Sequence, residues 1–477
     1  MADESTVRDM LETDRSLIKP LYSQRRPSEA IDLPSHRVEF NHGGERQAGL
    51  AHVSLRFCPS ERLCFTVDVN SEVGRSNTKA NEWAGELKLL DKGVSFPALC
   101  VRSECDHAGH KTLHIVPSES VITATQPSDN LATATFHLFN FPDFIGPEDY
   151  CITTVEGPHR QMKRCGRVIL KADGWNVTIA ATDKTADCCK ALEEYGGFII
   201  THMGKAERAD SSAFSSERLE DLLSCVHCFL SFALGRWAGV ALPIGFDQAG
   251  QRIFEQWGLP MVASGPWNGS LSWFDRHHGK LLSEVFPGFM ALWKDDTWNR
   301  TLRAALYWYL GANERATGIG VDVGLILAQT ALERLAWTYC VRHRKMVSGA
   351  AFEPRGLSAA DKLRCLTAAL DIPADIPAQL SALHARPGSR WKDGPEAVTT
   401  IRNSLVHPKA KQPLASKCLA EAWKLCLWYL DMVLLRLCHH RGSYANRLVS
   451  RREGQVEPVP WHHSQGDCQN SSARDLE

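Results

Sequence analysis

Apolar residues at three- and four-residue steps dominate the C-terminal part of the chain. One such stripe lies between Ala316 and Arg344, and it contains Val321, Leu325, Ala328, Leu332, Leu335 and Tyr339. A longer stripe follows a break from Pro408 to Pro413 and contains Leu419, Trp423, Cys426, Leu427, Leu430, Leu434 and Leu437. This period is typical of helices that bury one face. The pattern therefore predicts an α-helical bundle over residues 298–440.

Two helix starts are readable within this bundle. Asp393-Gly394-Pro395-Glu396 combines a capping residue, a proline that the first turn tolerates and a glutamate that can reach back to the cap. Ser358 with Asp361 three residues later predicts a second, shorter helix. The helix that follows Asp393 turns Val398, Ile401 and Leu405 inward.

The first two hundred residues show a different pattern, in which short β-prone runs alternate with turns. The runs are 36–40, 51–57, 63–69, 112–116, 132–139, 167–172, 175–180 and 196–202. Many short strands at close spacing are typical of an antiparallel sandwich or barrel. The predicted fold class is therefore α+β with several domains, in which a β-rich sandwich or barrel-like domain at 31–205 precedes the helical bundle.

Three further segments complete the predicted organisation. Residues 1–30 are charged and expected to be flexible, and the polar tail at 441–477 is expected to be disordered. Residues 206–297 form a helical, aromatic-rich connection. Its aromatic residues alternate with Leu and Val and not with Lys and Arg, which favours a core that joins two domains over a base-stacking surface.

Composition limits the partners that the chain can attract. The formal net charge is −1, so no global positive field draws the protein to nucleic acid. Binding of RNA would need a local basic patch, for which the candidates are Arg342, Arg344, Lys345, Lys409 and Lys411. The alternative interpretation is that these residues are solvated helix ends favoured by the helix dipole.

The chain has no N-terminal apolar run preceded by basic residues and no stretch of about 18 apolar residues, so a cytoplasmic protein without membrane contact is expected. Many of its 16 cysteines fall on apolar helix faces, which indicates reduced thiols.

One cluster has the composition of a metal site: Cys100, Cys105, His107 and His110. Its spacing matches no standard zinc pattern, and a strand end with a His-rich turn explains it equally well. No metal and no cofactor is therefore predicted.

The motif that carries chemistry is Arg402-Asn403-x-x-x-His407. A guanidinium stays charged at any working pH and can hold a phosphate through two parallel hydrogen bonds. The imidazole of His407 can take or give a proton near neutral pH. Because RNA carries its own nucleophile, the 2′-hydroxyl, these groups could cleave RNA without a metal.

The spacing of the motif raises a geometric difficulty. Asn403 and His407 share one face of a helix, whereas Arg402 and His407 splay by roughly 140°. Either the helix ends near His407, which Pro408 encourages, or two copies of the motif face each other in a dimer.

At these residues the chain resembles the HEPN superfamily, and more narrowly the ApeA-like HEPN proteins of bacterial phage defence. The resemblance is carried by residues 327–336, the capped segment 357–370, and Arg402-Asn403 with His407. It implies a metal-independent endoribonuclease that forms a homodimer through its helical domain and leaves 2′,3′-cyclic phosphate and 5′-hydroxyl ends. Arg402 would hold the phosphate, His407 would act as acid or base, Asn403 would position one of them, and Glu333 is a candidate to orient Arg402.

Under the same resemblance the N-terminal domain would sense a phage-derived trigger or restrain the ribonuclease, and the protein would act in antiphage defence by abortive infection. Anticodon loops of transfer RNA are attractive substrates because their bases are unpaired. Two alternatives stay open: a catalytically silent HEPN module that binds nucleic acid or a partner, and the toxin of a toxin–antitoxin pair.

Overall fold

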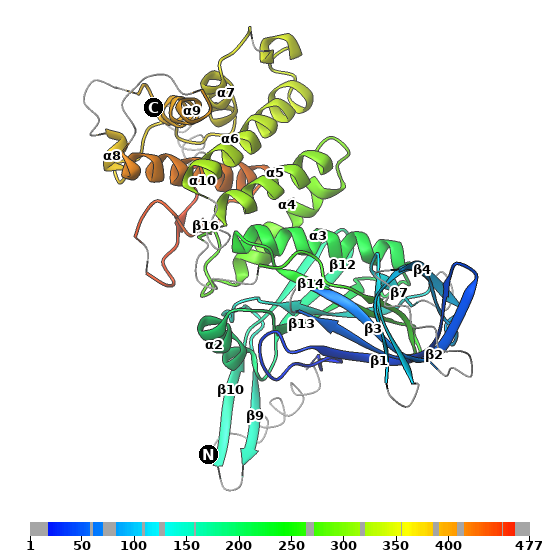
Figure 1. The fold of residues 1–477 in the computed structure, drawn as a ribbon. Coiled ribbons are helices and arrows are strands. Elements are labelled where there is room, and N and C mark those ends of the chain that lie inside the picture. Colours follow the sequence, from blue (N-terminus) through cyan, green and yellow to red (C-terminus); the bar gives the residue numbers. More distant parts are fainter. Residues whose placement is uncertain are drawn as a thin grey trace.

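The computed structural model describes residues 18–57, 61–69, 83–106, 110–123, 129–156, 159–263, 271–314, 320–353, 355–384, 391–407, 415–450 and 452–462. Within these ranges a β-barrel, a seven-stranded sheet and a helical bundle follow one another along the chain (Figure 1). The predicted combination of a β-rich N-terminal region with C-terminal helices is confirmed.

The barrel is closed and antiparallel. Its strands are β1 (Ile31–His42), β2 (Glu45–Arg56), β3 (Arg62–Val69), β4 (Trp83–Leu89), β5 (Val94–Cys105) and β6 (Lys111–Pro117), in the order β1-β2-β3-β6-β5-β4. Pairing of β1 with β4, from Val38 opposite Leu89 to Asn41 opposite Glu86, closes the ring. Alternate side chains such as Val53, Phe65 and Leu87 are buried inside it, as the period of two requires.

The second β-structure is an antiparallel sheet in the order β11-β12-β13-β8-β14-β15-β7. Its strands are β7 (Val121–Ile122), β8 (Thr133–Phe139), β11 (Arg167–Ala172), β12 (Trp175–Ala181), β13 (Ile200–Arg208), β14 (Gly239–Phe246) and β15 (Arg252–Trp257). A hairpin of β9 (Tyr150–Glu156) and β10 (His159–Cys165) projects from this region, next to helix α2 (Thr185–Tyr195) (Figure 1). The sheet thus continues beyond residue 205, and the expected helical connection at 206–297 contributes two of its strands.

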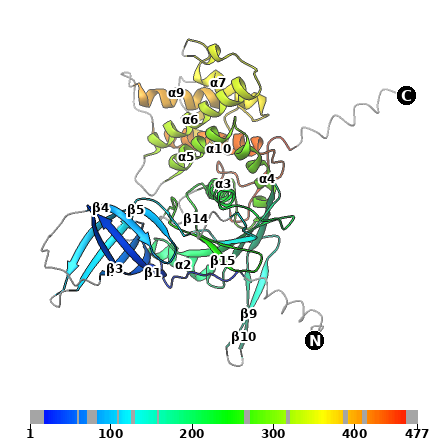
Figure 2. The same cartoon turned by 90° about the vertical axis from the view of Figure 1, so that its right-hand side faces the viewer.

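Helix α3 (Ser216–Leu234) lies between the sheet and the bundle in both views (Figures 1 and 2). The bundle contains α4 (Lys280–Lys294), α5 (Asn299–Asn313), α6 (Val321–Trp337), α7 (Ala359–Ala369), α8 (Ser381–His384), α9 (Gly394–Val406) and α10 (Ser416–Leu437). A π-helical segment, Thr338–His343, extends α6, and a 3₁₀ turn, Gly349–Phe352, precedes α7. Short strands β16 (Ser443–Tyr444) and β17 (Glu457–Pro458) pair after α10.

One hydrophobic core runs from the sheet into the bundle. It includes Val177 of β12, Phe229 of α3, Phe289 of α4 and Leu430 of α10. A second core fills the barrel and covers part of the sheet through residues such as Phe139 and Trp257. The core interpretation of the aromatic connection is confirmed for its described members, which include Trp273, Trp293 and Trp298; Trp267 lies outside the described residues.

Two expectations of disorder are wrong in part. Residues 18–30 pack against the sheet, where the Tyr22 N–H donates to His137 Nε2 at 3.2 Å and Gln24 Nε2 donates to the Phe198 carbonyl at 3.2 Å. In the tail, Arg447 is 3 % exposed and forms an ion pair with the buried Asp431 of α10. The sequence pattern missed both segments because their few anchoring residues lie among many polar ones.

Candidate active site

The candidate motif Arg402-Asn403-x-x-x-His407 lies at the end of α9, and this helix starts as its sequence predicts. Asp393 caps the helix by accepting from the Glu396 N–H at 2.9 Å, and Glu396 reaches back to accept from the Lys392 N–H at 2.7 Å. Arg364 of α7 pairs with Asp393, and its Nη2 lies 3.1 Å from Asp393 Oδ1. The cap and the ion pair together hold α9 against α7.

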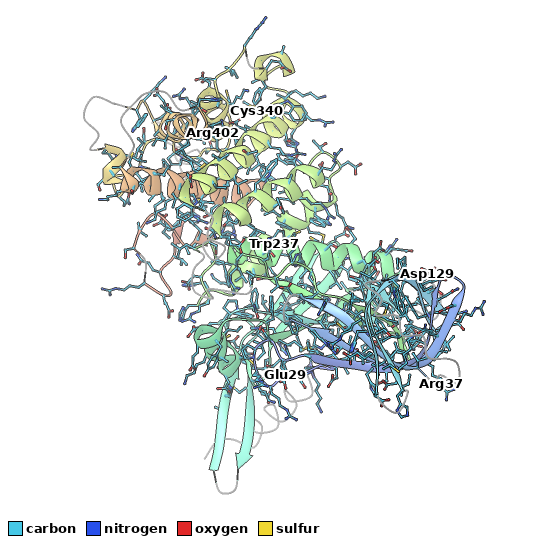
Figure 3. The ribbon with its side chains drawn as sticks, viewed as in Figure 1. Glu29, Arg37, Asp129, Trp237, Cys340 and Arg402 are labelled. Atoms are coloured by element: carbon cyan, nitrogen blue, oxygen red, sulfur yellow. The ribbon has the colours of Figure 1, made fainter. Side chains whose placement is uncertain are left out.

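The apolar residues of α9 determine which side faces the solvent. Val398 and Ile401 are fully buried and Leu405 is half-buried, as the stripe predicts. Arg402 is half-buried, whereas Asn403 and His407 are exposed. The motif is therefore accessible to a large ligand, and Figure 3 places Arg402 in the bundle, away from the barrel residue Arg37.

Helix α9 ends at the motif, which was one of the two solutions to its spacing. The last helical residue is Val406, and His407 has left helical geometry, with φ −120° and ψ 76°. Its N–H still donates to the Asn403 carbonyl at 2.9 Å. The splay of an ideal helix therefore does not apply to His407. The other solution, a dimer, is not tested by a single chain.

Arg402 carries a positive charge that no described carboxylate neutralises through an ion pair. Its Nη1 donates to Asn403 Oδ1 at 3.2 Å, so the neighbouring amide positions the guanidinium. Its Nε is buried without a hydrogen-bond partner in the described part of the chain. The remaining N–H groups are free to bind an anion.

Glu333, the candidate to orient Arg402, accepts instead from Gln329 Nε2 at 3.0 Å. Gln329 is fully buried, and its Nε2 also lies 3.5 Å from Thr399 Oγ1 of α9. No ion pair joins Glu333 to Arg402 among the residues that the structure describes, so in this chain Glu333 does not orient Arg402 directly.

The basic candidates divide into two groups. Arg342, Arg344 and Lys345 are exposed at the end of the π-helical segment, and the Arg342 guanidinium lies 5.6 Å from the centre of the Trp337 ring. Lys409 and Lys411 lie outside the described residues. The structure therefore brings part of the predicted patch to one helix end.

The cysteine and histidine cluster does not assemble in its described members. Cys100 is buried inside the barrel wall and Cys105 is exposed at the end of β5, five residues and about 17 Å further along the strand. His110 binds Asp106, with Nδ1 and Oδ2 3.0 Å apart, and His107 lies outside the described residues. Burial raises the pKa of the Cys100 thiol, which disfavours the thiolate that a metal needs. In the described residues, the end of β5 and the hydrogen bond between Asp106 and His110 account for this segment.

A pocket that sequence reasoning missed lies between α5 and α6. Its volume is about 360 Å³, and Arg300, Arg334 and Arg342 line it. These arginines come from two helices and a π-helical turn, and their spacing along the sequence gives no periodic signal. Of the lining residues, only Arg342 belongs to the basic patch that the sequence predicts.

Comparison with known proteins finds likeness to a prophage protein. Residues 126–268, which hold most of the seven-stranded sheet and α3, match the YopA central domain, and residues 295–457, which hold α5 to α10, match the YopA C-terminal domain. The "SPbeta prophage-derived uncharacterized protein YopA" of Bacillus subtilis (strain 168) is 27 % identical over 430 residues, which cover 86 % of this chain and 90 % of that protein.

No solved structure matches the chain. None of the described helices is both long and apolar enough to cross a membrane. The family models that match are those of YopA domains, so the resemblance to HEPN and ApeA-like proteins stays a prediction. By these comparisons the chain is similar to YopA, in its sheet and in the bundle that carries Arg402 and His407.

Proposed function

We propose that the protein is a metal-independent endoribonuclease of the HEPN type that acts in the cytoplasm, with its site at the end of α9. The observation that carries this proposal is the arrangement of Arg402. Its guanidinium is held by Asn403, has no carboxylate partner in the described part of the chain, and lies five residues before an exposed histidine that ends the helix. A cation without a carboxylate partner and a proton-transfer group five residues later are the two groups that cleavage at a phosphate needs.

The proposed reaction uses only groups of the chain and of the RNA. His407 takes the proton of the 2′-hydroxyl, and the 2′-oxygen attacks the adjacent phosphorus while Arg402 neutralises charge on the non-bridging oxygens. The bond from phosphorus to the 5′-oxygen breaks, and that oxygen takes up a proton. The products are a 2′,3′-cyclic phosphate and a 5′-hydroxyl.

A homodimer would supply the second proton-transfer group. A symmetric pair of chains that meet at the exposed ends of α9 brings two copies of the motif together, so that one His407 acts as base and the other as acid. Among the described residues, the site of a single chain holds one histidine and no carboxylate that orients Arg402, which is why the proposal includes the second copy.

The proposed biological role of the protein is in antiphage defence by abortive infection. The similar Bacillus protein is described as prophage-derived, and the β-rich N-terminal region here would bind the trigger. Transfer RNA is the proposed substrate class, because unpaired loop bases can be splayed out and read.

A catalytically silent binding module is the second candidate. It is favoured by the hydrogen bond between Gln329 and Glu333, because the half-buried Arg402 and the exposed His407 then have no carboxylate partner among the described residues. In that case the free guanidinium would bind an anionic partner and cleave nothing.

The decisive experiment sequences RNA ends that carry 5′-hydroxyls in bacteria expressing wild type, Arg402→Ala, His407→Ala or a control. Removal of an acid or base costs about 100-fold or more, so His407→Ala should abolish the breaks. His384→Ala and Arg355→Ala are matched controls, because both side chains are exposed and lie on other segments of the bundle. Breaks that persist in both motif variants would refute the ribonuclease, and no breaks with wild type, with or without phage, would favour the binding module.

Two further measurements test the mechanism. Cleavage by the purified protein should survive EDTA, whereas loss of activity that Zn²⁺ or Mg²⁺ restores would overturn the metal-free reaction. Because the proposed dimer uses both copies of His407, mixing Arg402→Ala with His407→Ala chains should not restore activity, and an excess of His407→Ala chains should inhibit wild type by forming mixed dimers with it. An active enzyme that is strictly monomeric would rule out the shared site.

A further inference from the structure

The pocket between α5 and α6 has the composition of an anion site. Three guanidinium groups line it, from Arg300 of α5, Arg334 of α6 and Arg342 of the π-helical segment. Asp296 is the one carboxylate among its lining residues, so the formal charge of the lining is +3 − 1 = +2. Hydroxyl donors complete the wall, and two of them, Thr301 and Thr338, are buried with their oxygens 2.8 Å apart.

The positive charge of this pocket is not neutralised within the described part of the chain. None of Arg300, Arg334 and Arg342 takes part in an ion pair there. The Nε of Arg334 is a buried atom with no hydrogen-bond partner, although its guanidinium lies 5.8 Å from the Trp308 ring centre. A buried donor left without an acceptor is costly, and a bound anion would satisfy it.

An aromatic surface stands beside the cations. Trp337 lines the pocket and is 40 % exposed, which is unusual for so large an apolar side chain. The Arg342 guanidinium contacts its ring at 5.6 Å. An exposed indole next to arginine is suited to stack a nucleobase.

The backbone of α6 is altered where it forms this pocket. Residues Thr338–His343 are π-helical, and the Arg344 N–H donates to the Tyr339 carbonyl five residues back at 2.8 Å. In a regular α-helix, Arg334 and Arg342 would differ by about 80° in direction, because eight residues turn by about 800°. The wider π turn reduces that offset and brings both guanidinium groups to one pocket; such turns are frequent at functional sites.

We propose that this pocket binds a nucleoside monophosphate, with the phosphate held by Arg300, Arg334 and Arg342 and the base stacked on Trp337. Arginine pairs with phosphate through two parallel hydrogen bonds, and the threonine hydroxyls add donors. A volume of about 360 Å³ lies within the range of small-molecule sites. The inference does not depend on the proposed ribonuclease, since Arg402, Asn403 and His407 do not line the pocket.

Isothermal titration calorimetry of the full chain tests the proposal with adenosine 5′-monophosphate, adenosine and inorganic phosphate as probes. Adenosine 5′-monophosphate should bind at one site per chain, and adenosine should bind at least about tenfold more weakly because it lacks the charge. Arg342→Ala and Arg300→Ala should each weaken the monophosphate about tenfold or more. Both side chains are exposed, so neither change removes core packing.

Two controls identify the site and the role of the indole. Arg344→Ala removes an exposed arginine two residues further on that does not line the pocket, and it should leave binding unchanged. Trp337→Ala should weaken adenosine 5′-monophosphate but not inorganic phosphate, because only the former has a base to stack. If Trp337→Ala weakened the binding of both probes, Trp337 would have a structural role, and the proposed stacking of the base would be overturned.

A further titration distinguishes a site for a free nucleotide from a site for the end of an RNA chain. A 5′-phosphorylated single-stranded tetranucleotide that binds while adenosine 5′-monophosphate does not would overturn the proposal in favour of an RNA groove. No binding of the monophosphate by wild type, or binding that Arg300→Ala and Arg342→Ala leave intact, would refute it. The Arg402→Ala/His407→Ala variant should bind the monophosphate as wild type does, so failure of the ribonuclease and failure of this site are distinguishable.

Discussion

Buried charges and imidazoles are the residues on which the stability of this protein depends most sharply. Arg447 contacts Asp431 through Nε at 2.6 Å, and it donates to the Tyr309 hydroxyl at 2.9 Å and to Asn313 Oδ1 at 3.0 Å. Asp431 is 1 % exposed. Burial favours loss of the Arg447 charge, but Asp431 and Tyr309 outweigh it and raise the pKa of the guanidinium. The group therefore stays charged and joins the tail to α5 and α10.

Arg447→Ala should destabilise the fold by about 3–5 kcal/mol, because it leaves the Asp431 carboxylate buried without its partner. Urea unfolding at neutral pH measures this loss. Arg452→Ala removes an exposed arginine of the same segment and should change the free energy of unfolding little. Arg447→Met combined with Asp431→Leu should recover much of the loss, and a double variant as unstable as Arg447→Ala would contradict the electrostatic reason.

His202 should make the fold sensitive to acid. It is fully buried, with its ring stacked on Phe144 at 5.5 Å, and burial lowers its pKa to about 3. The unfolded chain has an imidazole pKa near 6.5, so it binds more protons than the folded chain between about pH 6.5 and pH 3. The contribution of neutral His202 to the free energy of unfolding is therefore fully present above about pH 6.5, and it is lost as the pH falls towards 3.

His202→Phe should remove part of that dependence. The midpoint of urea unfolding should drop less between pH 7 and pH 4.5 in His202→Phe than in wild type, while His110→Gln, a change at an exposed histidine, should follow wild type. Equal drops in His202→Phe and wild type would show that other groups carry the acid sensitivity.

Among the secondary-structure elements, α9 bears most directly on the proposed function, because its start determines where Arg402 and His407 lie. Asp393 both caps α9 and pairs with Arg364, so one carboxylate fixes the helix and its contact with α7. Any weakening of this start should loosen the motif, which lies about two and a half to four turns away.

Asp393→Ala should cost about 1–2 kcal/mol for the lost cap, and more for the unpaired Arg364. Asp393→Asn should keep the cap and lose the ion pair. Its stability should therefore lie between that of Asp393→Ala and that of wild type. The thermal unfolding temperatures of the variants give this order of stability, with Asp375→Ala as a control at an exposed aspartate. An Asp393→Ala protein as stable as wild type would show that the Pro395 turn alone starts the helix.

Helices α6, α7, α9 and α10 were predictable from sequence because each carries a local signal. The stripe over 321–339 and the caps at Ser358 and Asp393 needed no knowledge of distant residues. Strand β14 gave no such signal, since it reads Gly-Val-Ala-Leu-Pro-Ile-Gly-Phe and nearly all of it is buried, so apolar and polar residues do not alternate. Closure of the barrel depends on pairing of β1 with β4, which lie more than forty residues apart.

The candidate site was predictable only in part for a related reason. The end of α9 at His407 follows from Pro408 in the sequence. The engagement of Glu333 with Gln329 depends on rotamers within a helix, and the pocket depends on a π turn that brings Arg334 towards Arg342. Neither feature has a period or a motif that could be read beforehand.

At the scale of the whole molecule, the helical bundle does not have a core of its own. The core that fills it continues through α4 and α3 to the sheet, and Tyr444 and Arg447 from the tail complete it. Boundaries at 298 and 440, which the sequence pattern suggested, would cut through this core.

A fragment of residues 298–440 should therefore fail to fold stably, whereas 271–462 should retain more helical structure because it keeps α4 and the tail. Circular dichroism and thermal unfolding of the two purified fragments compare them directly. A cooperative, stable 298–440 fragment would show that the tail and α4 are dispensable, and it would permit a direct test of restraint by the N-terminal region.

The burial of Arg447 also sets an order of events during protein synthesis. Helices α5 and α10 leave the ribosome before residue 447 does. Until residue 447 emerges, Asp431 and Tyr309 lack the guanidinium that binds both of them in the folded protein. The bundle that carries the α9 motif can thus reach its final packing only after the following segment has been translated. A nascent chain from which residue 447 has not yet emerged should therefore lack the packed bundle that positions Arg402 and His407. If the proposed ribonuclease activity depends on this packing, that activity would begin only after residue 447 has left the ribosome.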